Sequence, residues 1–174
     1  MEHQHNRARA ALKSVFGYDS FRPLQGDIIS HILDKKDALV VMPTGGGKSV
    51  CYQIPALLFN GLTVVVSPLI SLMKDQVDQL RECGAPAAFL NSSLADAEER
   101  AVQQQVREGR IKLLYVSPER LFQLGFLDEL AALNIALFAV DEAHCISTWG
   151  HSFRPEYQHL RVLKQRFPAV PVIA

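Results

Sequence analysis

A glycine-rich segment in the first third of the chain has the residue types that bind phosphate. It reads MPTGGGKS at positions 42–49 and follows the apolar run ALVVM at 38–42. Consecutive glycines permit a tight turn whose N–H groups point at an anion, and the start of a following helix adds partial positive charge. In such a loop Lys48 reaches the β- and γ-phosphates of a nucleotide and the Ser49 hydroxyl binds Mg²⁺. Because Met42 stands where the usual pattern has glycine, a flexible loop without a ligand is the alternative. The residues expected to bind ATP here are Thr44, Gly45, Gly46, Gly47, Lys48 and Ser49.

Two adjacent carboxylates follow a second apolar run. Asp141 and Glu142 come directly after IALFAV at 135–140 and begin the segment DEAH. Charged groups at the end of a buried strand are costly unless they hold a cation or move a proton. We expect Asp141 to bind Mg²⁺, Glu142 to polarise an attacking water, and His144 to couple the nucleotide to the rest of the protein. The alternatives are acidic residues that start a helix and a histidine that completes a turn.

Short apolar runs alternate with longer amphipathic stretches along the whole chain. The runs are continuously apolar, as in strands that are covered on both faces. This alternation predicts an α/β fold with a doubly wound, mainly parallel sheet. The strands are expected at 38–42, 63–66, 87–90, 111–116, 135–140 and 170–173. The helices are expected at 8–16, 23–33, 48–58, 69–83, 95–108, 118–121, 127–133 and 155–167.

Two Ser-Pro pairs also follow predicted strands, so they belong at the same sheet edge as the two segments above. Ser67 and Ser117 are suited to N-cap positions, and Pro68 and Pro118 to the first helical position. Because the start of a helix binds anions, these sites could hold nucleic-acid phosphates without sequence preference. Helix capping with no ligand is the alternative.

Composition limits the class of protein. The 174 residues suffice for one domain, and 18 basic residues balance 18 acidic ones, so no overall basic charge indicates nucleic-acid binding. The three cysteines form no CxxC pair, which argues against a zinc site or a disulfide framework. No signal peptide or membrane-spanning run is recognisable, so we expect a cytoplasmic protein with no membrane partner.

Taken together, these segments resemble the RecQ family of superfamily-2 DNA helicases. The resemblance covers about Val15 to Ala174, and its most specific part is DEAHCISTWGHSFRPEY at 141–157, since DEAH alone also occurs in RNA helicases. Thr148 and Ser152 depart from the family pattern, which has Gln and Asp there, so DNA coupling is expected to differ. The other matching segments are FGY at 16–18, FRPLQ at 21–25, TGGGKSVCYQ at 44–53, VSPLISLMKDQV at 66–77 and YVSPER at 115–120.

The resemblance implies a fold and an activity. Residues 1–174 would form an N-terminal RecA-like P-loop NTPase domain, the first of two motor domains, with 1–34 as a segment preceding the phosphate loop. The chain would end before that domain is complete, and the second RecA-like domain would be a partner in cis. The full-length protein would be an ATP-dependent 3′–5′ DNA helicase of DNA repair and recombination. It would be associated with the bacterial nucleoid, and single-strand-binding protein would be a further partner.

The resemblance also implies roles for residues that spacing alone does not single out. Gln25 would read the adenine edge, since an amide donates and accepts at once, with Tyr18 stacking on the base and Arg22 nearby. Without the resemblance, Gln25 would be read as a solvated helix residue. A non-helicase nucleotide-binding switch and a DEAH-type RNA helicase are the alternative functions.

An aromatic loop directly after the acidic segment completes the implied roles. Trp149 and Phe153 would stack on single-stranded bases, with Arg154 beside them, and so signal DNA occupancy to the ATP site. A buried core position is the ordinary alternative for a tryptophan.

Overall fold

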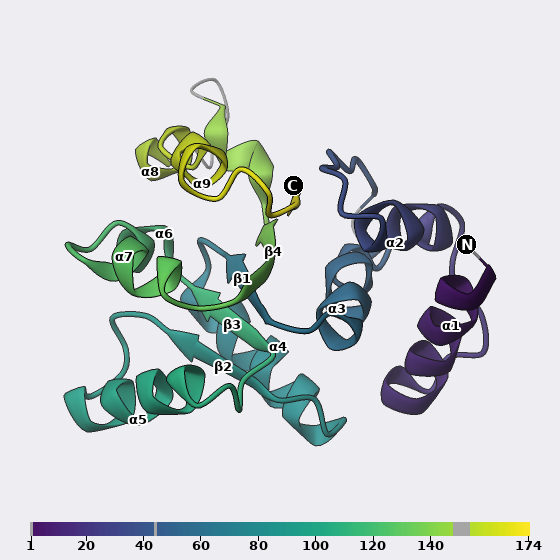
Figure 1. Ribbon diagram of the computed structural model, residues 1–174, viewed down its shortest axis with the longest axis horizontal. Coiled ribbons are helices and arrows are strands. Elements are labelled where there is room, and N and C mark those ends of the chain that lie inside the picture. Colours follow the sequence, from purple (N-terminus) through teal and green to yellow (C-terminus); the bar gives the residue numbers. More distant parts are fainter. Residues whose placement is uncertain (1, 44, 148–153) are drawn as a thin grey trace.

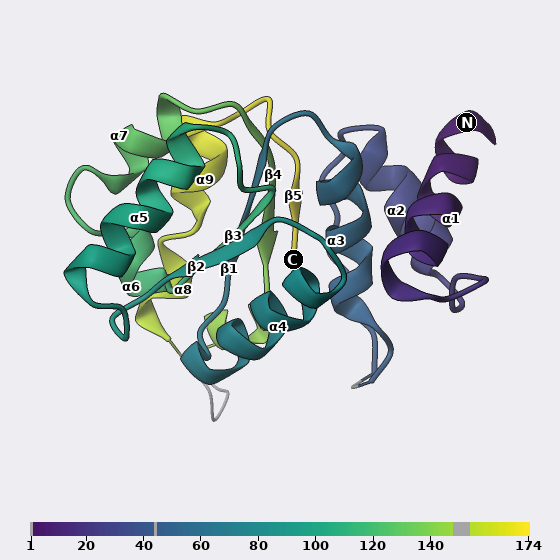
Figure 2. The same ribbon diagram turned by 90° about the horizontal axis from the view of Figure 1, so that it is seen from below.

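A wholly parallel sheet forms the centre of the protein, whose computed structural model describes residues 2–43, 45–147 and 154–174. The strand order is β2-β3-β1-β4-β5; Figure 1 labels the first four of these strands and Figure 2 all five. The strands are β1 (Leu62–Val66), β2 (Ala87–Leu90), β3 (Leu113–Val116), β4 (Ile135–Val140) and β5 (Val172–Ile173).

Helices cover both faces of this sheet (Figure 2). On one face lie α3 (Lys48–Leu58) and α4 (Ile70–Glu82), with α2 (Gln25–Leu33) and α1 (Glu2–Phe16) packed outside α3. On the other lie α5 (Asp96–Arg107), α6 (Pro118–Leu121), α7 (Phe126–Ala131), α8 (Pro155–Gln158) and α9 (Arg161–Arg166). The predicted doubly wound α/β fold is therefore confirmed.

The central strand shows why the apolar runs are continuous. All five residues of β1 are buried. Val64 and Val66 pack with the α5–α7 face, whereas Val65 packs with the α3–α4 face. Since successive side chains of a strand point to opposite faces, a strand covered on both sides needs apolar residues at every position.

The predicted strand at 38–42 is wrong in its extent. Ala38 forms only an isolated bridge with Ile173, and the Val40 N–H donates to the Ala174 carbonyl oxygen at 2.7 Å. Leu39 and Val41 point away from the core, with 79% and 88% of their surface exposed. The segment pairs with β5 alone among the described residues, and β5 is two residues long, so the ladder is too short for a regular strand.

The predicted helix at 155–167 is also wrong, because two short helices occupy it. Between α8 and α9 the backbone makes tighter bonds to the third preceding residue, such as Leu160 N–H to the Tyr157 carbonyl oxygen at 3.2 Å. Tyr157 is buried, and its hydroxyl donates to the Asp141 carbonyl oxygen at 2.8 Å. This bond holds α8 beneath the end of β4.

Within the described residues, no helix is long and apolar enough to cross a membrane.

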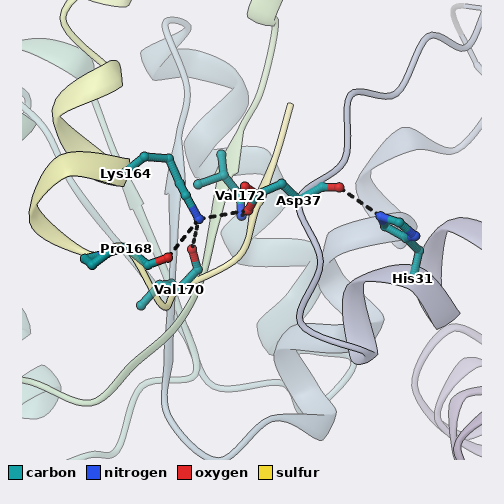
Figure 3. A network of polar contacts seen from close by, with 6 residues as sticks. All are labelled: His31, Asp37, Lys164, Pro168, Val170 and Val172. Carbon is teal, nitrogen blue, oxygen red and sulfur yellow. Dashed lines mark hydrogen bonds and ion pairs between the residues drawn. The ribbon is translucent and has the colours of Figure 1, made fainter.

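A polar network joins the segment before the phosphate loop to the end of the chain (Figure 3). The Asp37 carboxylate accepts hydrogen bonds from Lys164 Nζ at 3.1 Å and from the Val172 N–H at 2.9 Å. His31 Nε2 lies 2.8 Å from the Asp37 carbonyl oxygen. Helix α2, the phosphate-loop segment, α9 and β5 are thereby held together. Lys164 also donates to the carbonyl oxygens of Pro168 (3.2 Å) and Val170 (3.0 Å).

We expect the substitution Asp37→Asn to lower the free energy of unfolding by about 1 kcal/mol at neutral pH, because it removes the charged acceptor. Partial burial raises the pKa of Asp37, but the Val172 and Lys164 contacts outweigh it and leave that pKa below its ordinary value. The stabilisation is therefore present above the pKa that Asp37 has in the unfolded chain. It is lost as the pH falls through the lower pKa that Asp37 has in the folded protein. Urea unfolding at pH 7 and at acidic pH measures both effects.

Asp19→Asn is the matched control for this prediction, since Asp19 pairs with Lys13 where both side chains are largely exposed. Removing an exposed pair should change stability by only a few tenths of a kcal/mol. An equal loss in both variants would show that the Asp37 network is no more than a surface contact.

Candidate nucleotide site at the carboxyl ends of the strands

The register of the central strands places their carboxyl ends level with one another. Val66 of β1 pairs with Val116 of β3 on one side and with Val140 of β4 on the other. The pairing continues one residue further, since the Ser67 N–H donates to the Val116 carbonyl oxygen at 3.0 Å and the Asp141 N–H to that of Val66 at 2.8 Å. The polar residues that follow each strand therefore share one edge of the sheet.

The glycine-rich loop turns directly into α3. Gly45 and Gly47 have φ angles of 77° and 78°, a left-handed conformation that glycine adopts without steric cost. Lys48 is the first residue of α3, and its Nζ donates to the Met42 carbonyl oxygen at 3.2 Å. Ser49 follows in the first turn of the same helix. A turn of this shape at a helix start is suited to hold phosphate groups.

The segment around Gln25 holds this loop. Gln25 is buried, and its Nε2 donates to the Gly47 carbonyl oxygen at 3.0 Å while its Oε1 accepts from the Arg22 N–H at 2.8 Å. The Arg22 guanidinium bonds to the Gly45 carbonyl oxygen. Tyr18 lies exposed in the segment between α1 and α2. The structure thus brings Gln25 and Arg22 to the phosphate loop, and adenine contact by these residues remains a prediction.

The acidic segment lies at the same edge. The Asp141 carboxylate accepts from the Glu142 N–H at 3.0 Å, and Glu142 has a φ of 53°, a strained conformation for a residue other than glycine. His144 Nδ1 lies 3.2 Å from Glu142 Oε2 within a 3₁₀ turn (Ala143–Ile146), so the histidine both completes a turn and touches the second acid. A cavity of about 340 Å³ separates the two segments. Its polar lining residues are Lys48, Tyr52, Asp141, Glu142 and His144.

Electrostatics at Asp141 suit a cation. Burial raises the pKa of Asp141, and the neighbouring Glu142 carboxylate raises it further, while the hydrogen bond from the Glu142 N–H and the charge of Lys48 lower it. A carboxylate that is desolvated beside a second acid gains more from a bound cation than an exposed one does. One carboxylate and the Ser49 hydroxyl are hard oxygen ligands of the kind Mg²⁺ takes, with phosphates and waters completing its shell. The residues present therefore fit Mg²⁺ bound together with a nucleotide.

The two Ser-Pro pairs differ, and one prediction needs correction. Ser117 is the N-cap of α6 as expected, and its Oγ accepts from the Arg120 N–H at 3.2 Å. Ser67 is not an N-cap: it is buried, and α4 begins after Leu69, so Pro68 is outside the helix. Ser67 instead continues the β1–β3 pairing through its N–H, which leaves the chain extended past the strand.

The aromatic loop is largely outside the described residues. Thr44, Thr148, Trp149, Ser152 and Phe153 carry predictions and belong to the segments that the structure does not describe. Arg154 is described, and its Nη1 lies 3.2 Å from Glu119 Oε1 on α6. This places Arg154 next to the YVSPER segment.

Two polar residues beside the site, Tyr52 and Gln76, were assigned no role from the sequence. Tyr52 of α3 lines the cavity and donates to Gln76 Oε1 of α4 at 3.0 Å. A signal was present, because Gln76 directly precedes Val77 in the buried stripe of α4 and so borders the core. Arg120 of the YVSPER segment is largely buried and pairs with Glu99 of α5 at 2.7 Å.

Comparison with known proteins agrees with this geometry. The family model described as DEAD/DEAH box helicase matches residues 22–173. The protein named ATP-dependent DNA helicase RecQ in Haemophilus influenzae is 56% identical over 96% of this chain and 27% of that protein. Its namesake in Bacillus subtilis is 47% identical over 97% of this chain and 29% of that protein. The chain thus spans little more than a quarter of the length of these relatives.

Solved structures share the fold at low sequence identity. The DUF1998 helicase MrfA, in a structure bound to DNA, matches 96% of this chain and 26% of its own with a TM-score of 0.74 at 19% identity. A hypothetical ATP-dependent RNA helicase from Sulfolobus tokodaii matches all of this chain and 50% of its own with a TM-score of 0.70 at 19% identity. The RecA-like fold and the resemblance to RecQ helicases, both predicted from the sequence, are confirmed. With a family match over nearly the whole span, the chain belongs to the DEAD/DEAH box helicase family.

Proposed function

We propose that this chain is the ATP-binding motor domain of a RecQ-type, ATP-dependent DNA helicase. The observation that carries the proposal is the meeting of Lys48 with Asp141 and Glu142 around one cavity at the carboxyl edge of the sheet. The RecQ names of the relatives that match most of the chain supply the substrate class.

The residues at this edge have complementary tasks in phosphoryl transfer. The glycine loop surrounds the β- and γ-phosphates, and Lys48 leaves its contact with the Met42 carbonyl to bind them. Ser49 and Asp141 hold Mg²⁺, which neutralises the charge that develops on the phosphates. Glu142 takes up the proton of the attacking water. Its carboxylate is already oriented by His144.

Nucleic acid lies across the neighbouring part of the same edge in this proposal. Ser67 and Ser117 follow the adjacent strands β1 and β3, and Arg154 lies beside α6. The aromatic residues Trp149 and Phe153 would join this track. Backbone contacts of this kind grip a strand without reading its sequence, which translocation requires. Movement in the 3′ to 5′ direction, roles in repair and recombination, action at the nucleoid and contact with single-strand-binding protein complete the proposal.

The chain alone provides one side of the reaction. Charge is needed on both sides of the γ-phosphate, and all the candidate groups here come from one domain. We expect a second RecA-like domain to supply the rest, so the chain by itself should bind nucleotide and hydrolyse it slowly if at all.

The ATPase rate of the full-length protein tests the proposed function. We expect single-stranded DNA to stimulate hydrolysis at least several-fold and more than single-stranded RNA does. Lys48→Ala and Glu142→Gln should each lower the rate by about 10²-fold or more, because each removes a group that acts on the transferred phosphate. Equal rates without polynucleotide, with DNA and with RNA would favour a nucleotide switch, and stronger stimulation by RNA would favour an RNA helicase.

The shape of the phosphate loop gives a second prediction. A Cβ at Gly47 would lie 2.5 Å from the buried Gln25 Nε2 at a φ of 78°. Gly47→Ala should therefore displace the loop and weaken ATP binding by about tenfold, besides costing about 1 kcal/mol of stability through backbone strain. Titration with a fluorescent ATP analogue measures the first effect and thermal unfolding the second.

Gly84→Ala is the matched control for the loop variant. Gly84 has nearly the same φ, 77°, but no atom lies within 4 Å of its added Cβ. The control should lose similar stability and keep full ATP affinity. Equal affinity in the two variants would contradict the placement of the nucleotide at this loop.

A further inference from the structure

The peptide bond between the two acids of the site is held at both of its polar ends. At one end, the Glu142 N–H donates to the Asp141 carboxylate at 3.0 Å. At the other, the Asp141 carbonyl oxygen accepts from the Tyr157 hydroxyl at 2.8 Å. Because the atoms of a peptide bond lie in one plane, hydrogen bonds at its opposite ends fix the direction in which that plane faces.

This peptide plane sets the position of the Glu142 side chain. Glu142 has a φ of 53°, a left-handed angle that is unfavourable for a residue with a Cβ. The peptide bond on its other side is held by the 3₁₀ turn, since the Cys145 N–H donates to the Glu142 carbonyl oxygen at 2.9 Å. A rotation of the plane before Glu142 would therefore relieve the strained angle and move the Glu142 carboxylate. The contacts that hold the plane hold the carboxylate as well.

The contact from Tyr157 has one task, whereas the other contact has two. The Asp141 carboxylate is the candidate Mg²⁺ ligand besides accepting from the Glu142 N–H. A carbonyl oxygen can only accept, so the Tyr157 hydroxyl is the donor in its bond. Burial raises the pKa of Tyr157 above its ordinary value, so the hydroxyl keeps the proton that it donates at neutral pH.

Tyr157 is itself held firmly. Its side chain is 1% exposed, and the short helix that carries it begins at Pro155 and packs against the 3₁₀ turn. The Arg154 N–H donates to the Cys145 carbonyl oxygen at 2.9 Å, which attaches the start of this helix to the same turn. A side chain whose own position is fixed by packing can orient the group to which it bonds.

We propose that Tyr157 is a positioning residue whose hydroxyl fixes the peptide plane between Asp141 and Glu142, and thereby holds the Glu142 carboxylate in place to accept the proton of the attacking water. This inference rests on the proposed ATP-hydrolysing function. Tyr157 exchanges no proton in this account, so its contribution is geometric. Such a contribution is measurable, because a misplacement of about 1 Å can lower a rate by about 10²-fold.

The alternative is that Tyr157 only fills the space beneath the end of β4. Packing depends on the ring, whereas positioning depends on the hydroxyl, and Tyr157→Phe removes the hydroxyl while keeping the ring. Tyr115→Phe is the matched control. Tyr115 is similarly buried, and its hydroxyl also has a hydrogen bond, from Gln53 Nε2 at 3.2 Å.

Steady-state ATP hydrolysis by the full-length protein with single-stranded DNA tests the proposal, at a temperature at which thermal unfolding shows each variant to be folded. We expect Tyr157→Phe to lower kcat by about tenfold. The KM for ATP and the affinity for a fluorescent ATP analogue should stay within about twofold, because Glu142 acts on the water rather than on the bound nucleotide. Tyr115→Phe should lose thermal stability to a similar extent and keep kcat within about twofold.

A double variant shows whether the hydroxyl acts through Glu142. In a Glu142→Gln background the group that accepts the proton is already lost, so Tyr157→Phe should lower the remaining rate by less than about twofold. A further loss of about tenfold in that background would mean that the hydroxyl acts by another route, and the proposal would be wrong.

Replacement of Tyr157 by para-aminophenylalanine provides a rescue. The amine lies at the end of the same ring, is uncharged at neutral pH and donates a hydrogen bond. This variant should recover kcat to within about threefold of the wild type. A kcat as low as that of Tyr157→Phe, in a variant of wild-type thermal stability, would contradict the role of the hydrogen bond.

The outcomes separate this inference from the proposed function. If Tyr157→Phe keeps its kcat, or loses no more of it than Tyr115→Phe does, the hydroxyl serves packing alone and the positioning role is wrong. The proposed function fails differently: the wild type would hydrolyse no ATP, or Glu142→Gln would hydrolyse it at the wild-type rate. A rate that is lost in Glu142→Gln and kept in Tyr157→Phe leaves the proposed function standing without the positioning role.

Discussion

Parallel pairing of the three central strands is the constraint on which the site depends. The register places Val66 of β1 level with Val116 of β3 and Val140 of β4. The backbone hydrogen bonds between the strands continue into Ser67 and Asp141. A shift of one residue would turn each strand's side chains to the opposite face, where the core could not accept them. The apolar core thus holds the register, and the register holds the acid near the phosphate loop.

Polar contacts then hold the loops that leave this edge. The side chains of Gln25 and Arg22 donate hydrogen bonds to carbonyl oxygens of the glycine turn. The Asp37 network anchors the segment that leads into this turn. Glu142 keeps a left-handed φ beside His144. Strain of this kind persists where surrounding contacts over-determine the backbone, and Glu142 carries it at a position where chemistry is expected.

Much of this arrangement could be predicted from the sequence because the strands are buried on both faces. The runs at 87–90 and 135–140 and the helices at 48–58 and 118–121 have the predicted bounds. The segment at 38–42 is apolar but has too short a partner in β5 to form a ladder. The helix predicted at 155–167 is broken into α8 and α9, and the apolar periodicity of this segment does not indicate the break. Near the break, the Tyr157 hydroxyl donates a hydrogen bond to the Asp141 carbonyl oxygen.

The position of the two acids was predictable for a similar reason, because Asp141 and Glu142 follow β4 and are placed by the sheet. Lys48 is instead placed by the turn of the glycine loop into α3, and it lines the same cavity as the two acids. The roles of these residues stay predictions. Contacts between side chains distant in the sequence were not predictable. The hydrogen bond from Gln25 to the Gly47 carbonyl oxygen was not expected, while the contact of Gln25 with adenine stays a prediction. Gln76, which accepts from Tyr52, was given no role.

The central claim is that Mg²⁺ and ATP bind at the carboxyl edge of the sheet, and backbone NMR of the chain during an ATP titration tests it most directly. Shift changes are expected at 45–49, the glycine turn and the start of α3, and at 141–144, because Lys48 and the acidic segment line the same cavity. Saturating changes confined to these segments and their neighbours would support the claim. Changes centred instead on the groove between α5 and α7, near Val106 and Leu133, would contradict it, as would no response at millimolar ATP with Mg²⁺.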